Sequence, residues 1–141
     1  MAKTKSSRSE LLLPWPPSIN HYYRNVGGRT LISRKGREYR GTVGALVAGA
    51  NLPPFAPEAR LVAIIDVFPP DRRRRDLDNI QKPVLDALEH AGVYEDDSQI
   101  DILVTRRGGV VPGGGLRVVL ALAAAVTWSE RLAPVEGLSD E

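Results

Sequence analysis

Four arginines run directly into two aspartates in the segment DRRRRDLDN, residues 71–79. The arginines are Arg72, Arg73, Arg74 and Arg75, and the aspartates are Asp76 and Asp78. A second acidic segment, EDDSQ at residues 95–99, contains Asp97. Carboxylate oxygens are the ligands that hard divalent cations such as Mg²⁺ prefer. Guanidinium groups bind phosphate oxygens, so the segment combines the two kinds of charge that metal-assisted phosphodiester hydrolysis needs.

A lysine accompanies these carboxylates. Lys82 lies four residues after Asp78, and residues with this spacing share one face of a helix. A lysine in that place can orient a phosphate group or stabilise the charge that develops during cleavage by a metal-activated water. The chain has two histidines and no cysteine, so the residues do not favour a zinc site with thiolate or imidazole ligands.

A structural interpretation of the same residues stays open from the spacing alone. Acidic residues near a helix N-terminus interact favourably with the helix dipole, and Asp78 with Gln81 matches a capping box. The arginines Arg72 to Arg75 could also pair with Asp76 and Asp78 instead of binding a polyanion.

The elements around the acidic pair can be predicted from apolar spacing. The segment from Leu77 to Ala91 repeats apolar residues at helical intervals and precedes Gly92, a common helix stop. Pro83 is tolerated best near a first turn, which predicts a helix start near Asn79. The two aspartates are therefore expected at a strand-to-helix junction.

The strand that leads into this junction is predicted at residues 61–68, LVAIIDVF, because the run is continuous, apolar and β-branched. Asp66 is its one charged residue, and it is either a fourth acidic member of the site or a paired structural aspartate. A second helix is expected after Ser33, a good N-cap. Its apolar positions at helical spacing are Tyr39, Val43, Leu46, Val47 and Ala50.

Further strands are expected at residues 11–13, 99–107 and 116–126, with a hairpin turn at Gly27 and Gly28. In the strand at 99–107, Ile100, Ile102 and Val104 are expected on one side. These elements predict an α+β (mixed α/β) fold, in which a small mixed β-sheet packs with two α-helices.

Composition limits the remaining possibilities. The chain has 141 residues, and 43% of them are hydrophobic, enough for one small domain. Residues 1–10 are predicted to be a flexible basic tail and residues 127–141 a flexible C-terminal tail. No signal peptide and no apolar run of membrane-spanning length is evident, so a cytoplasmic protein without a membrane partner is expected. Positive charge gathers in residues 24–40 and 72–75, which favours a polyanionic partner.

The segments LPWPPSINHYYR, GGRTLIS and DRRRRDLDNIQKPVLDALEHAGVYEDDSQI together resemble the RusA family of Holliday junction resolvases, the crossover junction endodeoxyribonucleases. The resemblance covers residues 11–107 and implies a nuclease domain at 11–126. It implies Mg²⁺-dependent, or Mn²⁺-dependent, cleavage of four-way DNA junctions by a homodimer in DNA recombination and repair. By motif position it also implies three metal-binding catalytic aspartates, Asp76, Asp78 and Asp97, and an essential lysine, Lys82.

On this interpretation the arginines Arg72, Arg73, Arg74 and Arg75, together with Arg24, bind the DNA backbone while the aspartates hold the metal. Two other functions stay open, which are a non-catalytic nucleic-acid-binding module and a metal-dependent nuclease of another branched substrate. A binding module has no need of three aspartates and Lys82 together, so the complete set favours an enzyme. The sequence indicates neither the base preference at the cleavage site nor the dimer interface.

Overall fold

The computed structural model describes residues 7–126, 129 and 135. Its main element is a mixed four-stranded sheet with the strand order β1–β6–β4–β5. The strands are β1 (Arg8–Leu13), β4 (Leu61–Phe68), β5 (Ile100–Arg107) and β6 (Gly115–Leu122). Strand β6 is antiparallel to both β1 and β4, whereas β5 is parallel to β4.

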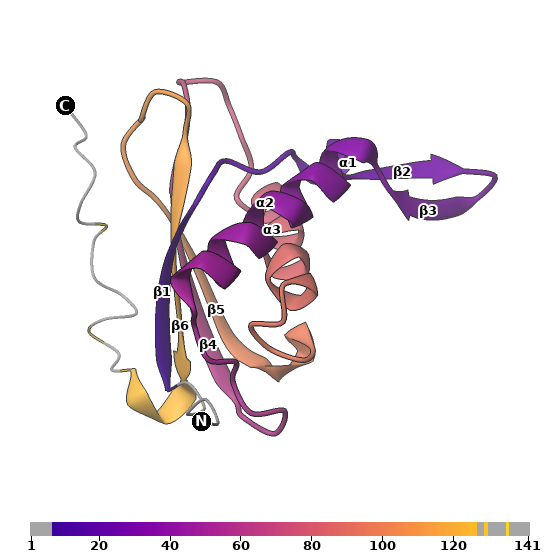
Figure 1. Cartoon of the computed structure of the whole chain (residues 1–141). Helices are drawn as coiled ribbons and strands as arrows, with labels where there is room; N and C mark the ends of the chain where they lie inside the picture. Colours follow the sequence, from indigo (N-terminus) through magenta and orange to yellow (C-terminus); the bar gives the residue numbers. More distant parts are fainter. Residues whose placement is uncertain (1–6, 127–128, 130–134, 136–141) are drawn as a thin grey trace.

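Two helices, α2 (Arg34–Ala50) and α3 (Asp78–His90), cover one face of this sheet (Figure 1). A mixed sheet with helices on one face is an α+β architecture, so the predicted fold class is confirmed. A third helix, α1 (Ile19–Tyr22), is only four residues long and was not expected. The predicted hairpin forms a separate two-stranded sheet of β2 (Tyr23–Val26) and β3 (Arg29–Ile32).

Strand β4 is central, as its apolar run predicted, and all eight of its residues are buried. The residues that point to the helices join the main core, which also contains Val43 of α2 and Val84 of α3. Val62 and Ile64 point the other way, into a smaller cluster with Val126. Because both faces of β4 are covered, its sequence has no polar–apolar alternation.

Helix α2 begins where the sequence predicted. The Ser33 side chain accepts a hydrogen bond from the backbone N–H of Gly36 at 3.0 Å. A Cβ atom at Gly36 would lie 2.4 Å from the carbonyl oxygen of Tyr22, so only glycine permits this close approach of α2 to α1. Tyr39 and Val43 are buried as expected, but Leu46 is 41% exposed because it lies beside the apolar stripe, not on it.

Helix α3 begins at Asp78, one residue before the predicted start. Pro83 is its sixth residue, one position later than a start at Asn79 would give, and its ring is buried. Proline has no N–H to donate, which leaves the Asn79 carbonyl without its usual helical partner. Burial of the ring in the core offsets part of that loss. Gly92, at φ +81°, ends the helix as predicted.

Strand β5 departs from simple alternation. Leu61 of β4 pairs with Ile100, but the next residue, Val62, pairs with Ile102, so Asp101 forms a bulge. Ile100 therefore packs on the main core, whereas Ile102 and Val104 pack on the smaller cluster. The expectation that all three would lie on one side is wrong, because one extra residue reverses the facing of the side chains.

The ends of the chain differ from the expected boundaries. Strand β1 begins at Arg8, so residues 8–10 of the expected N-terminal tail pair with β6. Their polar residues Arg8 and Glu10 alternate with the buried Ser9, which suits an edge strand with one covered face. Strand β6 ends at Leu122 and is followed by a 3₁₀ turn, Ala123–Ala125. The expected C-terminal tail, which includes Trp128, lies outside the described residues except for positions 129 and 135.

Among the described residues, none of the helices has both the length and the apolar composition needed to cross a bilayer.

Candidate active site

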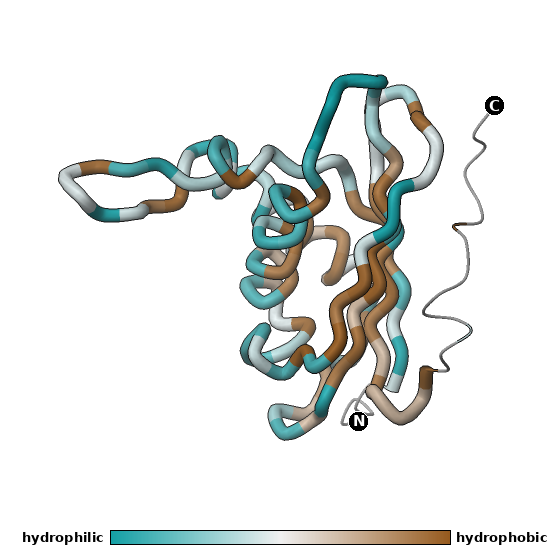
Figure 2. The backbone as a smooth tube through the Cα atoms, turned by 180° about the vertical axis from the view of Figure 1, so that it is seen from behind, coloured by the Kyte–Doolittle hydropathy of each residue, from teal (hydrophilic) through white to brown (hydrophobic). Residues whose placement is uncertain are grey.

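The connection between β4 and α3, residues 69–77 and here called the arginine loop, lies beyond the end of the sheet and is strongly hydrophilic (Figure 2). Its arginines are organised by Asp71. The Asp71 carboxylate accepts from Arg75 at 2.7 Å and from the backbone N–H of Arg73 at 2.9 Å. These two hydrogen bonds, the one from Arg75 first, lower the pKa of Asp71 to about 2. Arg75 also lies over the ring of Trp15, 5.6 Å from its centre.

Asp76 and Asp78 stay exposed although four arginines precede them. No hydrogen bond or ion pair to another described residue engages either side chain, so the alternative in which the arginines pair with them is wrong. The capping-box alternative is also wrong. Asp78 is the first residue of α3 and caps nothing, while Gln81 donates instead to the Thr105 hydroxyl at 2.8 Å.

Asp97 approaches Lys82 from a turn that precedes β5. Strands β4 and β5 are parallel, so the end of β4 and the start of β5 lie at opposite ends of the sheet. Asp97 instead opens a short 3₁₀ turn, η1 (Asp97–Gln99), beside α3. Its carboxylate lies 3.3 Å from the Nζ atom of Lys82. Lys82 itself lies one helical turn after Asp78 on α3. Burial lowers the pKa of Lys82, but the Asp97 carboxylate more than offsets this effect and the pKa is raised.

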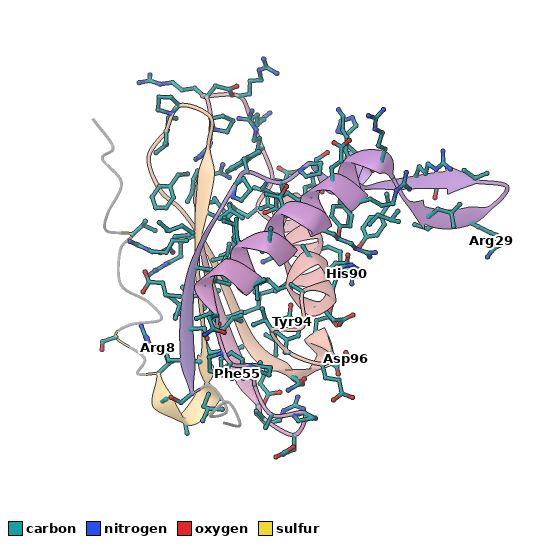
Figure 3. The ribbon with its side chains drawn as sticks, viewed as in Figure 1. Arg8, Arg29, Phe55, His90, Tyr94 and Asp96 are labelled. Atoms are coloured by element: carbon teal, nitrogen blue, oxygen red, sulfur yellow. The ribbon has the colours of Figure 1, made fainter. Side chains whose placement is uncertain are left out.

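A second acidic grouping was not predicted. Glu89, Asp96 and Asp97 each offer a carboxylate oxygen within 4.8 Å of the other two. In the part of the chain that the structure describes, no such group of three includes Asp76 or Asp78. Asp96 is exposed and caps η1 by accepting from the Ser98 N–H at 2.8 Å. Figure 3 shows Asp96 next to the C-terminal end of α3.

Glu89 has a structural task as well, since it accepts the backbone N–H of Asp97 at 2.8 Å. Helical spacing could have identified it. Along one side of α3 the polar residues recur at intervals of four, four and three, which keeps them on one face. They are Asp78, Lys82, Asp86 and Glu89.

Asp86, the third residue of this face, is tied to two other helices. Tyr22 of α1 donates to its carboxylate, and Arg40 of α2 donates to it at 2.7 Å and 2.9 Å. Burial, followed by the hydrogen bond to Asp86, raises the pKa of Tyr22. The triad of Tyr22, Arg40 and Asp86 is neutralised internally, so it fixes α1 against α2 and α3 and holds the adjacent Tyr23 in place.

Two cavities lie on either side of α1. One, of about 300 Å³, is lined by residues that include Trp15, Arg75, Asp76 and Asn79. The other, of about 570 Å³, lies between Lys82 and the residues of α1, β2 and β3. Of the candidate catalytic residues, Asp76 lines the first cavity and Lys82 lines the second.

The predicted DNA-binding arginines have unequal surroundings. Arg72 and Arg74 are exposed and make no hydrogen bond or ion pair to another described residue. Arg73 is exposed beside Asp71 at 3.6 Å, while Arg75 is largely covered. Arg24, on β2, is exposed at the 570 Å³ cavity. Asp66, the possible fourth acid, is 2% exposed and paired with Arg106 and Arg117, so it is the structural aspartate of the two alternatives.

A small α+β domain with exposed carboxylates, a paired lysine and exposed arginines has the features of a metal-dependent enzyme acting on phosphodiesters. The model of the family Endodeoxyribonuclease RusA matches residues 14–120. The chain belongs to the RusA family.

Three relatives illustrate the similarity, and each is named as a crossover junction endodeoxyribonuclease RusA. The protein of Enterobacteria phage HK97 is 46% identical over 110 residues, which cover 77% of this chain and 90% of the relative. The protein of Enterobacteria phage 82 is 44% identical, and that of Escherichia coli strain K12 is 43% identical. For both of these, the similarity covers 78% of this chain and 91% of the relative.

Proposed function

We propose that this chain is a metal-dependent endonuclease that resolves four-way DNA junctions. The observation that carries the proposal is the state of Asp76 and Asp78, which are exposed and unpaired among the described residues although four arginines adjoin them. Two carboxylates that stay unpaired although arginines adjoin them are available to bind a cation. The names of the family relatives supply the substrate class, crossover junctions in DNA.

The proposed cation is Mg²⁺, with Mn²⁺ as a substitute, held by Asp76, Asp78 and Asp97. These ligands are all carboxylate oxygens, which suits a hard cation, and the exposure of Asp76 and Asp78 leaves room for the waters that Mg²⁺ retains. When bound, the cation would supply positive charge to the phosphate and lower the pKa of a water molecule. Asp97 also belongs to the group with Glu89 and Asp96, so that group is the competing ligand set.

Lys82 is proposed to act on the phosphate. Its ammonium group has three N–H donors, and the contact with Asp97 uses one of them. The remaining donors can bind a non-bridging phosphate oxygen and stabilise the negative charge that grows there during cleavage. Its raised pKa keeps the group protonated, so Lys82 serves as a fixed positive charge and not as a base.

The exposed arginines Arg72, Arg73 and Arg74, with Arg24 and the partly covered Arg75, are proposed to hold the DNA backbone. They belong to two elements on different sides of α1, the arginine loop and β2. A branched DNA that contacts both would pass over Asp76 and Lys82. Backbone contacts of this kind position the substrate without reading its sequence.

The active species is proposed to be a homodimer. A four-way junction is resolved by two nicks on opposed strands, and one chain offers residues for one site. A two-fold dimer supplies two equivalent sites whose symmetry matches that of the junction. The test mixes wild-type subunits with excess Asp78→Asn subunits on a junction that reports each nick separately. Heterodimers should nick one strand only, and bilateral cutting by isolated heterodimers would contradict one site per subunit.

The proposed function is tested with purified protein on synthetic DNA. A four-way junction, a linear duplex and a flap of the same sequences are each incubated with Mg²⁺ or with a chelator. Paired nicks in the junction, absent from the duplex and abolished by the chelator, are expected. Tight binding without cleavage in any metal would indicate a binding module. Faster cleavage of the flap would indicate a nuclease of another branched substrate.

A further inference from the structure

Lys82 lies between two carboxylates on the surface of α3. Asp78 precedes it by four residues and Asp86 follows it by four, so the three side chains share one face of the helix. Among the described residues, however, the ion pair of Lys82 is with Asp97, at 3.3 Å. The direction in which Lys82 points therefore depends on what satisfies Asp86, one helical turn away.

Asp86 is satisfied by the two helices that adjoin α3 (Figure 1). Its Oδ2 atom accepts from the Tyr22 hydroxyl of α1 and from two nitrogen atoms of Arg40 of α2, at 2.7 Å and 2.9 Å. Arg40 also donates to the Tyr22 hydroxyl at 3.0 Å. Burial, followed by the hydrogen bond to Asp86, raises the pKa of Tyr22 and keeps its phenol neutral. Arg40 is therefore the member of the triad that neutralises the carboxylate.

The two ion pairs on this side of α3 differ in how firmly they are held. Lys82 makes a single contact with Asp97, and the two side chains are 52% and 32% exposed. Such a pair is weak, and the four-carbon stem of a lysine is flexible. Arg40 and Asp86 are only 24% and 17% exposed and meet through two nitrogen atoms. Lys82 is thus the cation that can move, and Arg40 is the one that is fixed.

The consequence for Asp86 follows from its partial burial. A partly buried carboxylate without a counter-charge is costly, so it attracts a cation that can reach it. On α3 that cation is Lys82, because residues four apart on a helix are neighbours. If Arg40 were neutral, Lys82 would therefore turn from Asp97 to Asp86.

We propose that Arg40 is a positioning residue for the cleavage reaction, because it neutralises Asp86 and so leaves Lys82 directed at Asp97 and at the phosphate. The proposal rests on the proposed function, in which Lys82 stabilises charge on that phosphate. Helix α2 lines neither of the two cavities beside α1, yet through Arg40 it determines where the lysine points.

The first test is Arg40→Met, which removes the charge and keeps most of the length of the side chain. At saturating junction and Mg²⁺, the cleavage rate constant should fall by at least about tenfold, part of the roughly 100-fold effect of losing one charge-stabilising group. The dissociation constant of the junction should change by less than about threefold, because the lost interaction acts in the transition state. The matched control is Arg34→Met, which removes an exposed arginine of α2 that pairs with Glu38 and should leave both quantities unchanged.

The decisive variant combines Arg40→Met with Asp86→Asn and so removes both charges. Lys82 then has no uncompensated carboxylate to turn to, and cleavage should return to within about threefold of the wild-type rate, a non-additive result. A purely structural role for Arg40 predicts the opposite, because the double variant lacks the ion pair between α2 and α3 and would stay slow. Thermal unfolding checks that each variant is folded. If Arg40→Met does not fold, Arg40→Gln takes its place, since its amide still donates to Asp86 without carrying charge.

The second test does not require cleavage. In a crystal structure of the Arg40→Met protein without metal, the Nζ atom of Lys82 should lie within hydrogen-bond distance of Asp86 and no longer contact Asp97. A lysine that remains beside Asp97, or a double variant that cleaves as slowly as Arg40→Met, would overturn the proposal. If the lysine moves as expected but the wild-type protein does not cleave junctions, the proposed function fails and the positioning of Lys82 by Arg40 stands.

Discussion

Asp66 lies on β4, Asp76 lies in the connection that follows this strand, and Asp78 is the first residue of α3. The surroundings of Asp66 and of the acidic pair Asp76 and Asp78 are opposite. Asp66 is 2% exposed, and Arg106 donates to it at 2.7 Å and 2.9 Å and Arg117 at 3.0 Å and 3.2 Å. Asp76 and Asp78 adjoin four arginines, yet their side chains pair with none of the described residues.

Burial explains the difference. A carboxylate inside the sheet has lost its water and must be compensated by neighbouring cations, or folding becomes unfavourable. An exposed carboxylate keeps its water, so the fold does not require a partner for it. The nearby arginines are instead directed elsewhere, Arg75 to Asp71 and Trp15, and Arg72 and Arg74 to solvent. The buried and paired Asp66 therefore stabilises the sheet, whereas the exposed Asp76 and Asp78 are available to bind a ligand.

The strongest test of this comparison is the Asp78→Asn variant, which removes the negative charge of the side chain and keeps its shape. Junction cleavage should fall by at least about 100-fold, the scale typical of losing one group that stabilises charge in a transition state. Unfolding free energy should change by no more than about 0.5 kcal/mol, because the side chain is exposed and has no described partner. Junction binding should persist or tighten, because one negative charge near phosphate is gone.

The matched control is Glu89→Gln, which keeps an oxygen to accept the Asp97 N–H but loses the negative charge. If Asp76, Asp78 and Asp97 hold the metal, this variant should cleave at nearly the wild-type rate. The opposite outcome, with Glu89→Gln inactive and Asp78→Asn active, would transfer the metal site to the group of Glu89, Asp96 and Asp97.

Asp66→Ala should produce the reverse pattern, a large loss of stability. Removing one partner of a buried ionic cluster costs about 3–5 kcal/mol, and Asp66 is the buried carboxylate to which both Arg106 and Arg117 donate. Denaturant unfolding followed by circular dichroism measures the loss, and the fraction that remains folded should still cleave. A stable Asp66→Ala protein without cleavage would mean that Asp66 belongs to the active site.

The fold could be predicted from sequence where local chemistry decides it. The Ser33 cap, the Gly92 stop and the continuous apolar run of β4 each have one dominant cause, and each was confirmed. The bulge at Asp101 was not predicted, because strand register decides it. Register depends on a partner strand that is distant in the sequence.

The site was predictable in its residue types and not in its geometry. Spacing placed Lys82 on the face of Asp78, but the approach of Asp97 depends on the η1 turn, which Glu89 and Asp96 stabilise. The 570 Å³ cavity depends on how the β2–β3 ribbon leaves the body of the protein. No local pattern encodes that direction, because contacts between separate elements hold the base of the ribbon, such as the 2.8 Å hydrogen bond from the Ser33 N–H to the Tyr22 carbonyl.

The salt dependence of junction binding can distinguish the paired arginines from the unpaired ones. Each arginine that contacts a phosphate releases condensed counter-ions, so replacing it should reduce the slope of log K against log salt by about 1. Arg72→Ala with Arg74→Ala should therefore reduce the slope by about 2, measured by fluorescence anisotropy in a metal that does not support cleavage. The control is Arg34→Ala, which removes an exposed arginine that pairs with Glu38 on α2. An unchanged slope in the double variant would mean that the arginine loop does not contact DNA.

The smallest expected effect concerns Asp71, the one carboxylate of the arginine loop that is paired. Its pKa is lowered to about 2 by the hydrogen bond from Arg75 and then by that from the Arg73 backbone. A pKa lower in the folded than in the unfolded chain means that this pairing favours folding above the ordinary aspartate pKa. The contribution is lost as the pH falls towards 2.

A ¹³C-detected NMR titration of the Asp71 carboxyl group should give a midpoint near 2 in the wild-type protein. The midpoint should move towards the ordinary aspartate value in Arg75→Ala, because the backbone N–H of Arg73 is then the main remaining donor. Asp71→Asn tests the consequence for function. Arg75 would lose its carboxylate partner while Trp15 still holds the guanidinium, so cleavage should change by less than about threefold, because an exposed ion pair contributes little. A wild-type midpoint at the ordinary value would show that Arg75 is not held by Asp71 and belongs with Arg72 and Arg74 among the arginines free to bind phosphate.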